Sequence, residues 1–194
     1  MIVTPRSARI IAIVLPFLIE YTHDTTRSFM NYFAELQQTL AKLDPAPLLP
    51  FVRACTGTLW LAGNGGSAST AQHWACDLSK AAGRRVQALG SNPAVLTAWA
   101  NDNDYANALS EELKSVAQPN DRLICISCSG MSKNITILLR QAWLLKLKRA
   151  IITGSGMAWP TPVDLVVNVP HTHYGIIEDC HLAIGHWLTE ELQK

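Results

Sequence analysis

Residues 58–80, TLWLAGNGGSASTAQHWACDLSK, are the stretch of sequence that decides the fold. Residues 58–62 form a short apolar run that favours a strand, and the glycines in residues 63–66 interrupt it with flexible backbone. Ser67 is placed to cap a helix that begins near Ala68. The pattern predicts a strand, a turn and a helix in direct succession.

The glycine-rich turn has two interpretations. Free N–H groups at a helix N-terminus attract anions, so glycines that let a ligand approach there form a phosphate site. A glycine-rich turn after a strand also occurs simply as a tight turn. The stretch matches neither the dinucleotide fingerprint GxGxxG nor the P-loop GxxxxGK[ST], and both interpretations stay open.

The predicted helix carries His73 and Asp77, four residues apart and therefore on one face. An imidazole and a carboxylate one turn apart suit a shared metal ion or an acid/base pair. A hydrogen bond on a surface or at an interface is the alternative interpretation.

A second strand, turn and helix are predicted further along the chain. The apolar strand at residues 122–126 leads into Ser127, Ser129 and Ser132, and the helix at 133–147 follows. Hydroxyl groups at the carboxyl end of a strand, at the start of a helix, are typical of a second phosphate site. Simple capping would require only one of these serines.

Composition limits the class of protein. With 48% hydrophobic and 16% charged residues, the 194-residue chain can bury the core of one domain and leave apolar surface for subunit contacts. A net charge of +1 gives no reason to expect nucleic-acid binding. The five cysteines are irregularly spaced, and Cys125 and Cys128 lie across a strand end, so we expect reduced thiols and a cytoplasmic protein.

The N-terminus resembles a signal peptide only superficially. The apolar run at residues 10–19 follows two arginines, but residues 20–24 offer no small-residue cleavage site, and the run is too short to span a membrane. We interpret residues 1–24 as an N-terminal extension or helix and residues 25–194 as a single domain, with export as the alternative.

The remaining pattern predicts alternating helices and strands. The apolar face of the helix at residues 25–43 suits pairing between copies of the chain. Near-continuous apolar strands predict a parallel α/β sheet with helices on both faces. Helices are also expected at 48–55, 93–99 and 106–117, and strands at 86–89, 149–153 and 164–169. A polar turn at 101–105 is expected to cap the helix at 106–117.

Four of the six histidines lie in residues 171–186, together with Glu178 and Asp179. Such a cluster beside an apolar helical pattern indicates a functional site. Packing and surface contacts are the simpler interpretation for His171, His173 and His181.

Several ordered motifs over residues 25–194 resemble those of the SIS (sugar isomerase) domain, and within it the phosphoheptose isomerases. They are Gly63-Asn64-Gly65-Gly66-Ser67-Ala68 with Ala71-Gln72-His73, Leu96-Thr97-Ala98 with Asn101-Asp102, Ile126-Ser127-Cys128-Ser129-Gly130-Met131-Ser132, Thr153-Gly154, and residues 178–186.

The resemblance implies a three-layer sandwich around a flavodoxin-like five-stranded parallel sheet. It also implies a cytoplasmic homotetramer of heptose or lipopolysaccharide biosynthesis, with active sites at subunit contacts and no nucleic-acid or membrane partner. The implied enzyme converts sedoheptulose 7-phosphate to D-glycero-D-manno-heptose 7-phosphate.

The same resemblance assigns the site residues. One Zn²⁺ per subunit maps to His73, Asp77, Glu178 and His186, and the catalytic residues are Asp77, His186 and Glu178. The substrate-binding residues are Asn64, Gly65, Ser67, Asn101, Asp102, Ser127, Cys128, Ser129 and Ser132.

The chain departs from the family at several of these positions. The family has Glu where this chain has Asp77, which reaches about 1.5 Å less far, and Gln where it has Glu178. Cys128 and Met131 replace a threonine and an asparagine of the phosphate loop, and Gly175-Ile176 replaces an Asp-Arg pair.

Geometry restricts the implied zinc site. Glu178 and His186 are eight residues apart, so on one straight helix their Cα atoms lie about 12 Å apart along the axis. Both reach one ion only with extended side chains or from different subunits.

The expected chemistry is aldose–ketose isomerisation through an enediol. Asp77 or Glu178 removes the proton next to the carbonyl, His186 returns one to the neighbouring carbon, and zinc balances the developing negative charge. Two alternatives remain. One is a non-catalytic SIS domain that binds a phosphosugar or a replication initiator, and the other is an isomerase of a different phosphoketose.

Overall fold

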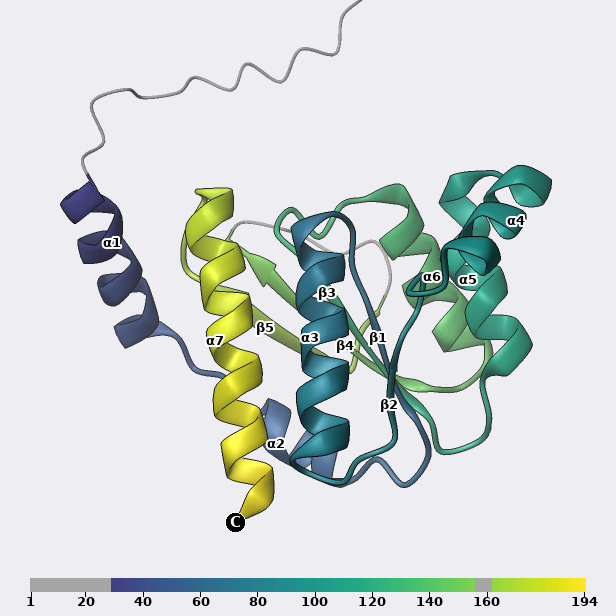
Figure 1. Ribbon diagram of the computed structural model, residues 1–194, viewed down its shortest axis with the longest axis horizontal. Coiled ribbons are helices and arrows are strands. Elements are labelled where there is room, and N and C mark those ends of the chain that lie inside the picture. Colours follow the sequence, from purple (N-terminus) through teal and green to yellow (C-terminus); the bar gives the residue numbers. More distant parts are fainter. Residues whose placement is uncertain (1–28, 156–161) are drawn as a thin grey trace, which may run out of the picture.

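Five parallel strands form the centre of the molecule in the computed structural model, which describes residues 29–155 and 162–194 (Figure 1). The strand order is β2-β1-β3-β4-β5. The register aligns Leu61 of β1 with Ile124 of β3, and Ile124 with Ala150 of β4. The strands are β1 (Leu59–Ala62), β2 (Val86–Ala88), β3 (Arg122–Ser127), β4 (Lys148–Gly154) and β5 (Leu165–Val169).

Four helices cover one face of the sheet. Alternate strand residues such as Leu61 and Ile126 point to this face and pack with Trp74 of α3 and Ile184 of α7 in one apolar cluster. Figure 1 shows α3 and α7 side by side in front of the sheet, with α1 beside α7. The four are α1 (Phe29–Lys42), α2 (Leu48–Arg53), α3 (Gly66–Lys80) and α7 (Tyr174–Gln193).

Three helices lie on the other side. Leu123 and Ile151 point to the second face and pack with Leu113 of α5 and Leu138 of α6. The helix α4 packs on α5. These helices are α4 (Pro93–Asn103), α5 (Tyr105–Val116) and α6 (Lys133–Leu144). The predicted three-layer α/β sandwich with a five-stranded parallel sheet is therefore confirmed.

Three local predictions are wrong. Gly65 has φ +52° and lets α3 begin at Gly66, so Ser67 lies buried inside the first turn and caps nothing. α4 continues through residues 101–103 of the predicted polar turn until Asp104, whose φ of 74° ends it, whereas the predicted capping of the next helix is confirmed, since the Asp104 side chain accepts from the Ala106 amide. α6 ends at Leu144, because Lys146 takes the left-handed conformation that terminates helices.

Predictions for the N-terminal extension at residues 1–24, including the apolar run at 10–19, lie outside the described residues. The helix expected from residue 25 is described from Phe29. In residues 29–155 and 162–194, no helix is both long and apolar enough to cross a bilayer.

Candidate active site

The two predicted phosphate loops meet at the point where the sheet changes direction. β1 and β3 are neighbours, and the chain leads from β1 outward to β2 but from β3 in the other direction to β4. Ala62 and Cys125 are partners near the carboxyl ends of these two strands. Loops that diverge at such a switch point leave a crevice, which is where open α/β sheets bind ligands.

A reciprocal pair of amide hydrogen bonds joins the two loops. The Asn64 amide donates to Asn134 Oδ1 (2.9 Å), and the Asn134 amide donates to Asn64 Oδ1 (2.7 Å). The Tyr105 hydroxyl also donates to Asn64 Oδ1, at 2.9 Å. Sequence reasoning found Asn64 but missed Asn134 and Tyr105. Asn134 lies two residues after Ser132, the last serine of the motif. This place in the first turn of the predicted helix was the signal that could have identified it as part of the site.

The serine loop uses its hydroxyls in different ways. Ser127 Oγ accepts from the Gly130 amide (3.0 Å) and Ser129 Oγ from the Met131 amide (3.2 Å), so these two side chains shape the turn. Ser132 stands at the N-cap of α6, but its side chain makes no capping hydrogen bond. The Ser132 hydroxyl therefore does not occupy the first amides of α6. An anion site requires such amides to be left free by the cap residue.

Asn101 and Asp102 lie apart from these loops in their hydrogen bonding. They occupy the exposed last turn of α4, where the Asn101 amide donates to Asp102 Oδ1 at 3.1 Å. No hydrogen bond among the described residues joins either side chain to Asn64 or to the serine loop. Their predicted substrate contact stays a prediction.

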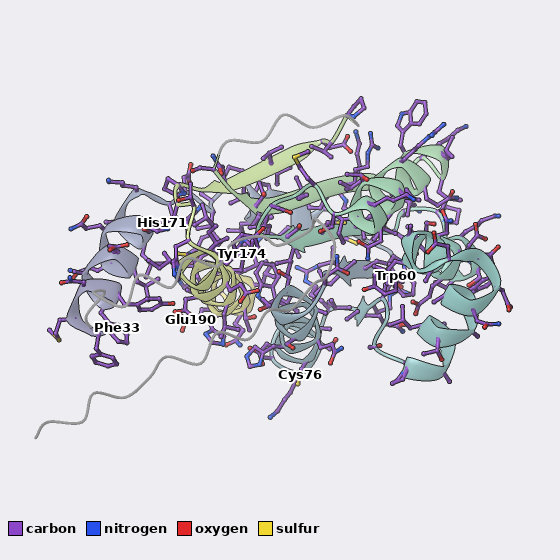
Figure 2. All side chains as sticks on the ribbon, turned by 90° about the horizontal axis from the view of Figure 1, so that it is seen from above. Phe33, Trp60, Cys76, His171, Tyr174 and Glu190 are labelled. Atoms are coloured by element: carbon purple, nitrogen blue, oxygen red, sulfur yellow. The ribbon has the colours of Figure 1, made fainter. Side chains whose placement is uncertain are left out.

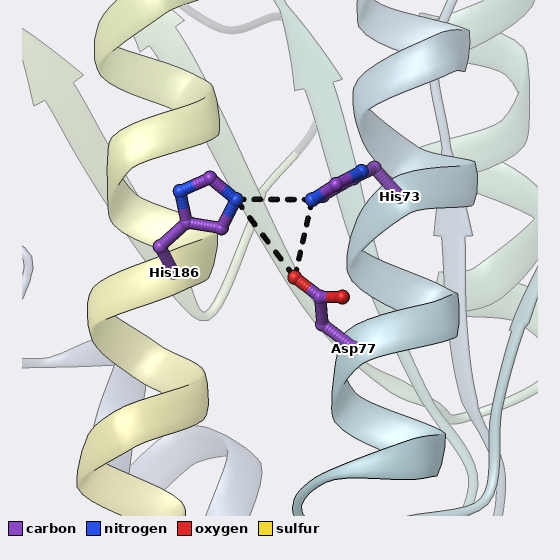
Figure 3. A group of neighbouring side chains, drawn as sticks. All are labelled: His73, Asp77 and His186. Atoms are coloured by element: carbon purple, nitrogen blue, oxygen red, sulfur yellow. Dashed lines mark hydrogen bonds and ion pairs between the residues drawn. The ribbon is translucent and has the colours of Figure 1, made fainter.

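Three of the four predicted metal ligands converge between α3 and α7, and we call His73, Asp77 and His186 the cation cluster (Figure 3). His73 Nε2 lies 3.0 Å from His186 Nε2 and 3.1 Å from Asp77 Oδ2, and His186 Nε2 lies 3.8 Å from the same oxygen. Their ligand atoms all lie within 4.8 Å of one another. The cluster is half exposed, so a ligand has access from solvent.

The donor set fits a zinc ion. Two nitrogens on one tetrahedral zinc, each about 2.0–2.1 Å from it, lie about 3.3 Å apart, close to the spacing seen here. A neutral imidazole nitrogen either donates or accepts, so His73 Nε2 cannot at once donate to Asp77 and accept from His186. A shared cation removes this conflict, since all three groups would then act as ligands.

Close packing of α3 on α7 brings the cluster together. A Cβ atom on Gly185 would collide with the indole of Trp74, so only glycine lets the helices approach this closely. The Trp74 Nε1–H donates to the His181 carbonyl at 3.1 Å, which fixes the register of the two helices. His73 and Asp77 flank Trp74 on α3, and His186 follows Gly185 on α7.

Glu178 lies outside the cation cluster. An ideal Cβ built on Gly66 would be 2.6 Å from Glu178 Oε1, so the carboxylate lies against the first turn of α3. It also lies beside the thiol of Cys128. The predicted substrate residues Gly65, Ser67 and Cys128 therefore lie near Glu178, on the side of the two loops.

The other C-terminal histidines differ among themselves. His171 forms an ion pair with Glu35 at 3.4 Å, and the His171 and His173 rings contact each other edge to face. His181 is completely buried, and neither ring nitrogen has a hydrogen-bond partner among the described residues. Burial lowers the pKa of His181 to about 4. All five cysteines are free, as expected.

Comparison with solved structures gives the class of protein. A phosphoheptose isomerase from Francisella tularensis superimposes with a TM-score of 0.75 at 26% identity, covering 85% of this chain and 96% of that one. The phosphoheptose isomerase GmhA from Neisseria gonorrhoeae gives a TM-score of 0.77 at 24% identity, covering 84% and 96%, which shows the shared fold. The fold is that of the SIS-domain phosphosugar isomerases.

Sequence comparison narrows the class. A curated phosphoheptose isomerase of Chlorobaculum parvum is 35% identical over 180 residues, which span 85% of this chain and 86% of the relative. No model of a protein family matches the sequence. The chain belongs to the phosphoheptose isomerase family and is an isomerase.

Proposed function

We propose that the protein converts sedoheptulose 7-phosphate to D-glycero-D-manno-heptose 7-phosphate. The observation that carries the proposal is the cation cluster on α3 and α7, in a chain of this family whose two phosphate loops meet at the switch point of the sheet. A phosphate-binding end and an acid/base centre are the two parts that isomerisation of a phosphosugar needs.

The serine loop would hold the phosphate. Ser129 and Ser132 are partly accessible, and the first amides of α6 lie directly behind them. Binding energy from this remote group orients the reacting end of the sugar. Because Asn134 ties the serine loop to Asn64, the position of the phosphate and that of the sugar are mechanically linked.

His73, Asp77 and His186 would hold one Zn²⁺ per subunit. When bound, zinc would balance the negative charge that develops on the carbonyl oxygen during enolisation. Two histidines and a carboxylate leave coordination positions open for substrate oxygens, which is typical of catalytic rather than structural zinc.

Asp77 would carry the proton transfers in this proposal. Through the carboxylate oxygen that the cation leaves free, it removes the proton next to the carbonyl to give an enediol, and it returns that proton to the former carbonyl carbon while the hydroxyl proton moves from one oxygen to the other. The predicted acid role of His186 requires that its Nε2 be free of the cation. His73 stays a ligand and orients Asp77, whose Oδ2 lies 3.1 Å from its ring.

The working protein is proposed to be a cytoplasmic homotetramer. α1 supports this assembly, because it exposes Phe29, Met30, Phe33 and Leu40 to solvent in the single chain. An exposed stripe of large apolar side chains on one helix is typical of a subunit contact. Figure 2 shows Phe33 at the end of the molecule formed by α1.

The test is NMR of sedoheptulose 7-phosphate incubated with the purified protein in deuterated water, with zinc and with chelator. We expect heptose 7-phosphate to appear, with deuterium at the carbon next to the carbonyl and loss of both signals on chelation. Absence of turnover and of exchange in folded, zinc-loaded protein would refute the assignment. Exchange that persists in chelator would refute the zinc proposal alone.

A further inference from the structure

A small network of side chains joins the N-termini of three helices. Asn64 lies two residues before α3 begins, Tyr105 is the first residue of α5, and Asn134 lies in the first turn of α6. Helices α5 and α6 pack on each other (Figure 1). We call Tyr105, Asn64 and Asn134 the amide network.

The backbone fixes which way both carboxamides of this network face. The Ile135 N–H, which can only donate, lies 3.0 Å from one side-chain atom of Asn134, so this atom is the oxygen Oδ1. The Asn134 nitrogen therefore faces Asn64 and donates to its Oδ1 at 2.7 Å. The Asn64 Nδ2 in turn donates to Asn134 Oδ1 at 2.9 Å. Because Asn134 is only 4% exposed, water does not compete for these bonds.

Tyr105 occupies the remaining acceptor position of Asn64. Its hydroxyl donates to Asn64 Oδ1 at 2.9 Å, so this oxygen accepts one hydrogen bond from Tyr105 and one from Asn134. A carbonyl oxygen has two lone pairs, and none is then left for a ligand. The second N–H of Asn64 Nδ2 has no partner among the described residues, and Asn64 is partly exposed. To a ligand in the crevice, Asn64 therefore offers a donor and no acceptor.

The start of α5 holds the Tyr105 hydroxyl in place. Asp104 ends α4, and its side chain accepts from the Ala106 amide at 3.4 Å, so that α5 begins at Tyr105. Ala106 and Leu109 are buried, and Leu109 packs in the apolar cluster between α5 and the sheet. The Tyr105 ring itself is half exposed. Removal of its hydroxyl should therefore leave the fold intact.

We propose that Tyr105 is a positioning residue that makes Asn64 a donor-only contact for an oxygen atom of the sugar. Two hydrogen bonds into the Asn64 oxygen also polarise the carboxamide, which strengthens its remaining N–H as a donor. The matching group of the ligand is an acceptor, namely a carbonyl oxygen or a lone pair of a hydroxyl. The inference rests on the proposed function only in taking a phosphosugar as the ligand.

The test compares the binding of glucitol 6-phosphate, which cannot be isomerised, with that of inorganic phosphate. Calorimetry on the full chain in chelator gives the dissociation constant of the alditol phosphate, and displacement titration gives that of phosphate. Tyr105→Phe removes the hydroxyl and keeps the ring. We expect it to weaken binding of the alditol phosphate by about three- to tenfold, which is typical of one hydrogen bond. Phosphate binding should be unchanged, because Asn134 still joins the serine loop to Asn64.

The matched control is Tyr32→Phe. It also removes a tyrosine hydroxyl that donates to a side chain on another helix, Asp179 Oδ2 at 2.6 Å. The control should change neither dissociation constant. Equal weakening of both ligands by Tyr105→Phe would mean that the hydroxyl only supports the fold, and unchanged binding of the alditol phosphate would mean that it does not act on the ligand. Either result, or a wild type that binds the alditol phosphate no better than phosphate, would overturn the proposal.

The side-chain amide signals of Asn64 report the direction of its hydrogen bond to the ligand. In protein labelled with ¹⁵N-asparagine, these signals are assigned by their absence in Asn64→Asp. We expect saturation with glucitol 6-phosphate to move one of the two amide protons downfield, as entry into a hydrogen bond does. The movement should be smaller in Tyr105→Phe. If neither proton moves in the wild type, Asn64 does not donate to the ligand and the inference is wrong.

Cobalt binding separates this role from an effect on the cation cluster. Co²⁺ accepts the nitrogen and oxygen ligands that are proposed for zinc. Tyr105→Phe should keep the Co²⁺ affinity of the wild type within about threefold, since no described hydrogen bond joins Tyr105 to the cluster. A loss of about tenfold would mean that the hydroxyl acts on the cluster and would refute the inference. Because none of these readouts requires turnover, a failure of the isomerase assay would refute the proposed function and leave the binding results intact.

Discussion

His181 is a single buried residue that makes the stability of the protein depend on pH. Its ring is 0% exposed, and burial lowers its pKa to about 4. The unfolded chain binds a proton near pH 6.5, whereas the folded chain resists protonation until about pH 4. Its contribution is therefore fully present above pH 6.5 and is lost as the pH falls from 6.5 to 4, by about 3 kcal/mol in total.

We expect His181→Leu to flatten this acid dependence. Leucine has no titratable group and removes two buried nitrogens that have no hydrogen-bond partner in the described part of the chain, so the variant should lose less stability between pH 7 and pH 5. Urea unfolding at several pH values measures the effect. The control is Ile177→Val, another buried change on α7, which should lower the free energy of unfolding by the same amount at all pH values. Parallel curves for wild type and His181→Leu would contradict the prediction.

Asn134 is a second single residue whose replacement we expect to change both stability and substrate binding. Asn134→Ala removes both hydrogen bonds between the side-chain amides of Asn134 and Asn64. Among the described residues, the Asn64 side chain then keeps only the hydrogen bond from the Tyr105 hydroxyl. We expect a loss of about 1–3 kcal/mol in unfolding free energy and a raised KM for the phosphosugar. Thermal unfolding and steady-state kinetics measure the two effects.

Asn107→Ala provides the comparison, because it removes one surface hydrogen bond to the Asn103 carbonyl. It should change the unfolding free energy by less than about 1 kcal/mol and leave KM unaltered. Equal effects of the two variants on KM would mean that the bridge between the loops does not position the substrate.

Among the elements, the contact between α3 and α7 decides whether the cation cluster exists. A methyl group at Gly185 would meet the Trp74 indole and force the helices apart. We expect Gly185→Ala to destabilise the fold by about 1–3 kcal/mol and to weaken Co²⁺ binding by at least about tenfold, since His186 follows directly. Calorimetry and cobalt titration give the two readouts.

Ala183→Ser is the control for this variant, since it adds one heavy atom at a half-buried position on the same helix. It should leave cobalt affinity unchanged. If Gly185→Ala kept wild-type cobalt affinity, the close approach of the helices would not be what assembles the cluster.

Elements were largely predictable from the sequence, and their junctions were not. Apolar runs bounded by glycine and proline predicted all five strands, because buried parallel strands need such runs. The cap at Ser67 and the extent of the turn at 101–105 were predicted wrongly, because Gly65 and Asp104 adopt positive φ and move the helix boundaries. The capping of the next helix by that turn is confirmed at Asp104. Spacing paired His73 with Asp77, but His186 is 113 residues away from His73 and joined them only through the family resemblance.

At the scale of the whole molecule, the exposed apolar side chains of α1 bear on the proposed assembly of subunits. Phe29 is 75% and Phe33 47% exposed, and their rings contact each other with centroids 4.7 Å apart. We expect Phe33→Asp to reduce the proposed tetramer to smaller species, because a charge at the centre of an apolar contact is left unpaired. Sedimentation velocity measures the assembly.

Trp143→Asp is the matched control, as it places a charge on another exposed aromatic position, on α6 across the sheet. It should leave the assembly intact. A Phe33→Asp protein with the same sedimentation coefficient as wild type would exclude α1 as the subunit contact.

The pairing of α3 with α7 also determines when, during synthesis, the three side chains of the cation cluster come together. Among the described residues, the sheet up to β5 and the six helices α1 to α6 are complete before the ribosome has made residues 174–193. Until that last helix emerges and docks, a nascent chain carries His73 and Asp77 without His186, so it lacks the third ligand of the cluster. Loading of the proposed zinc would therefore be a late event in biogenesis, and a ribosome stalled before residue 174 would display a nearly complete scaffold that holds no assembled cluster.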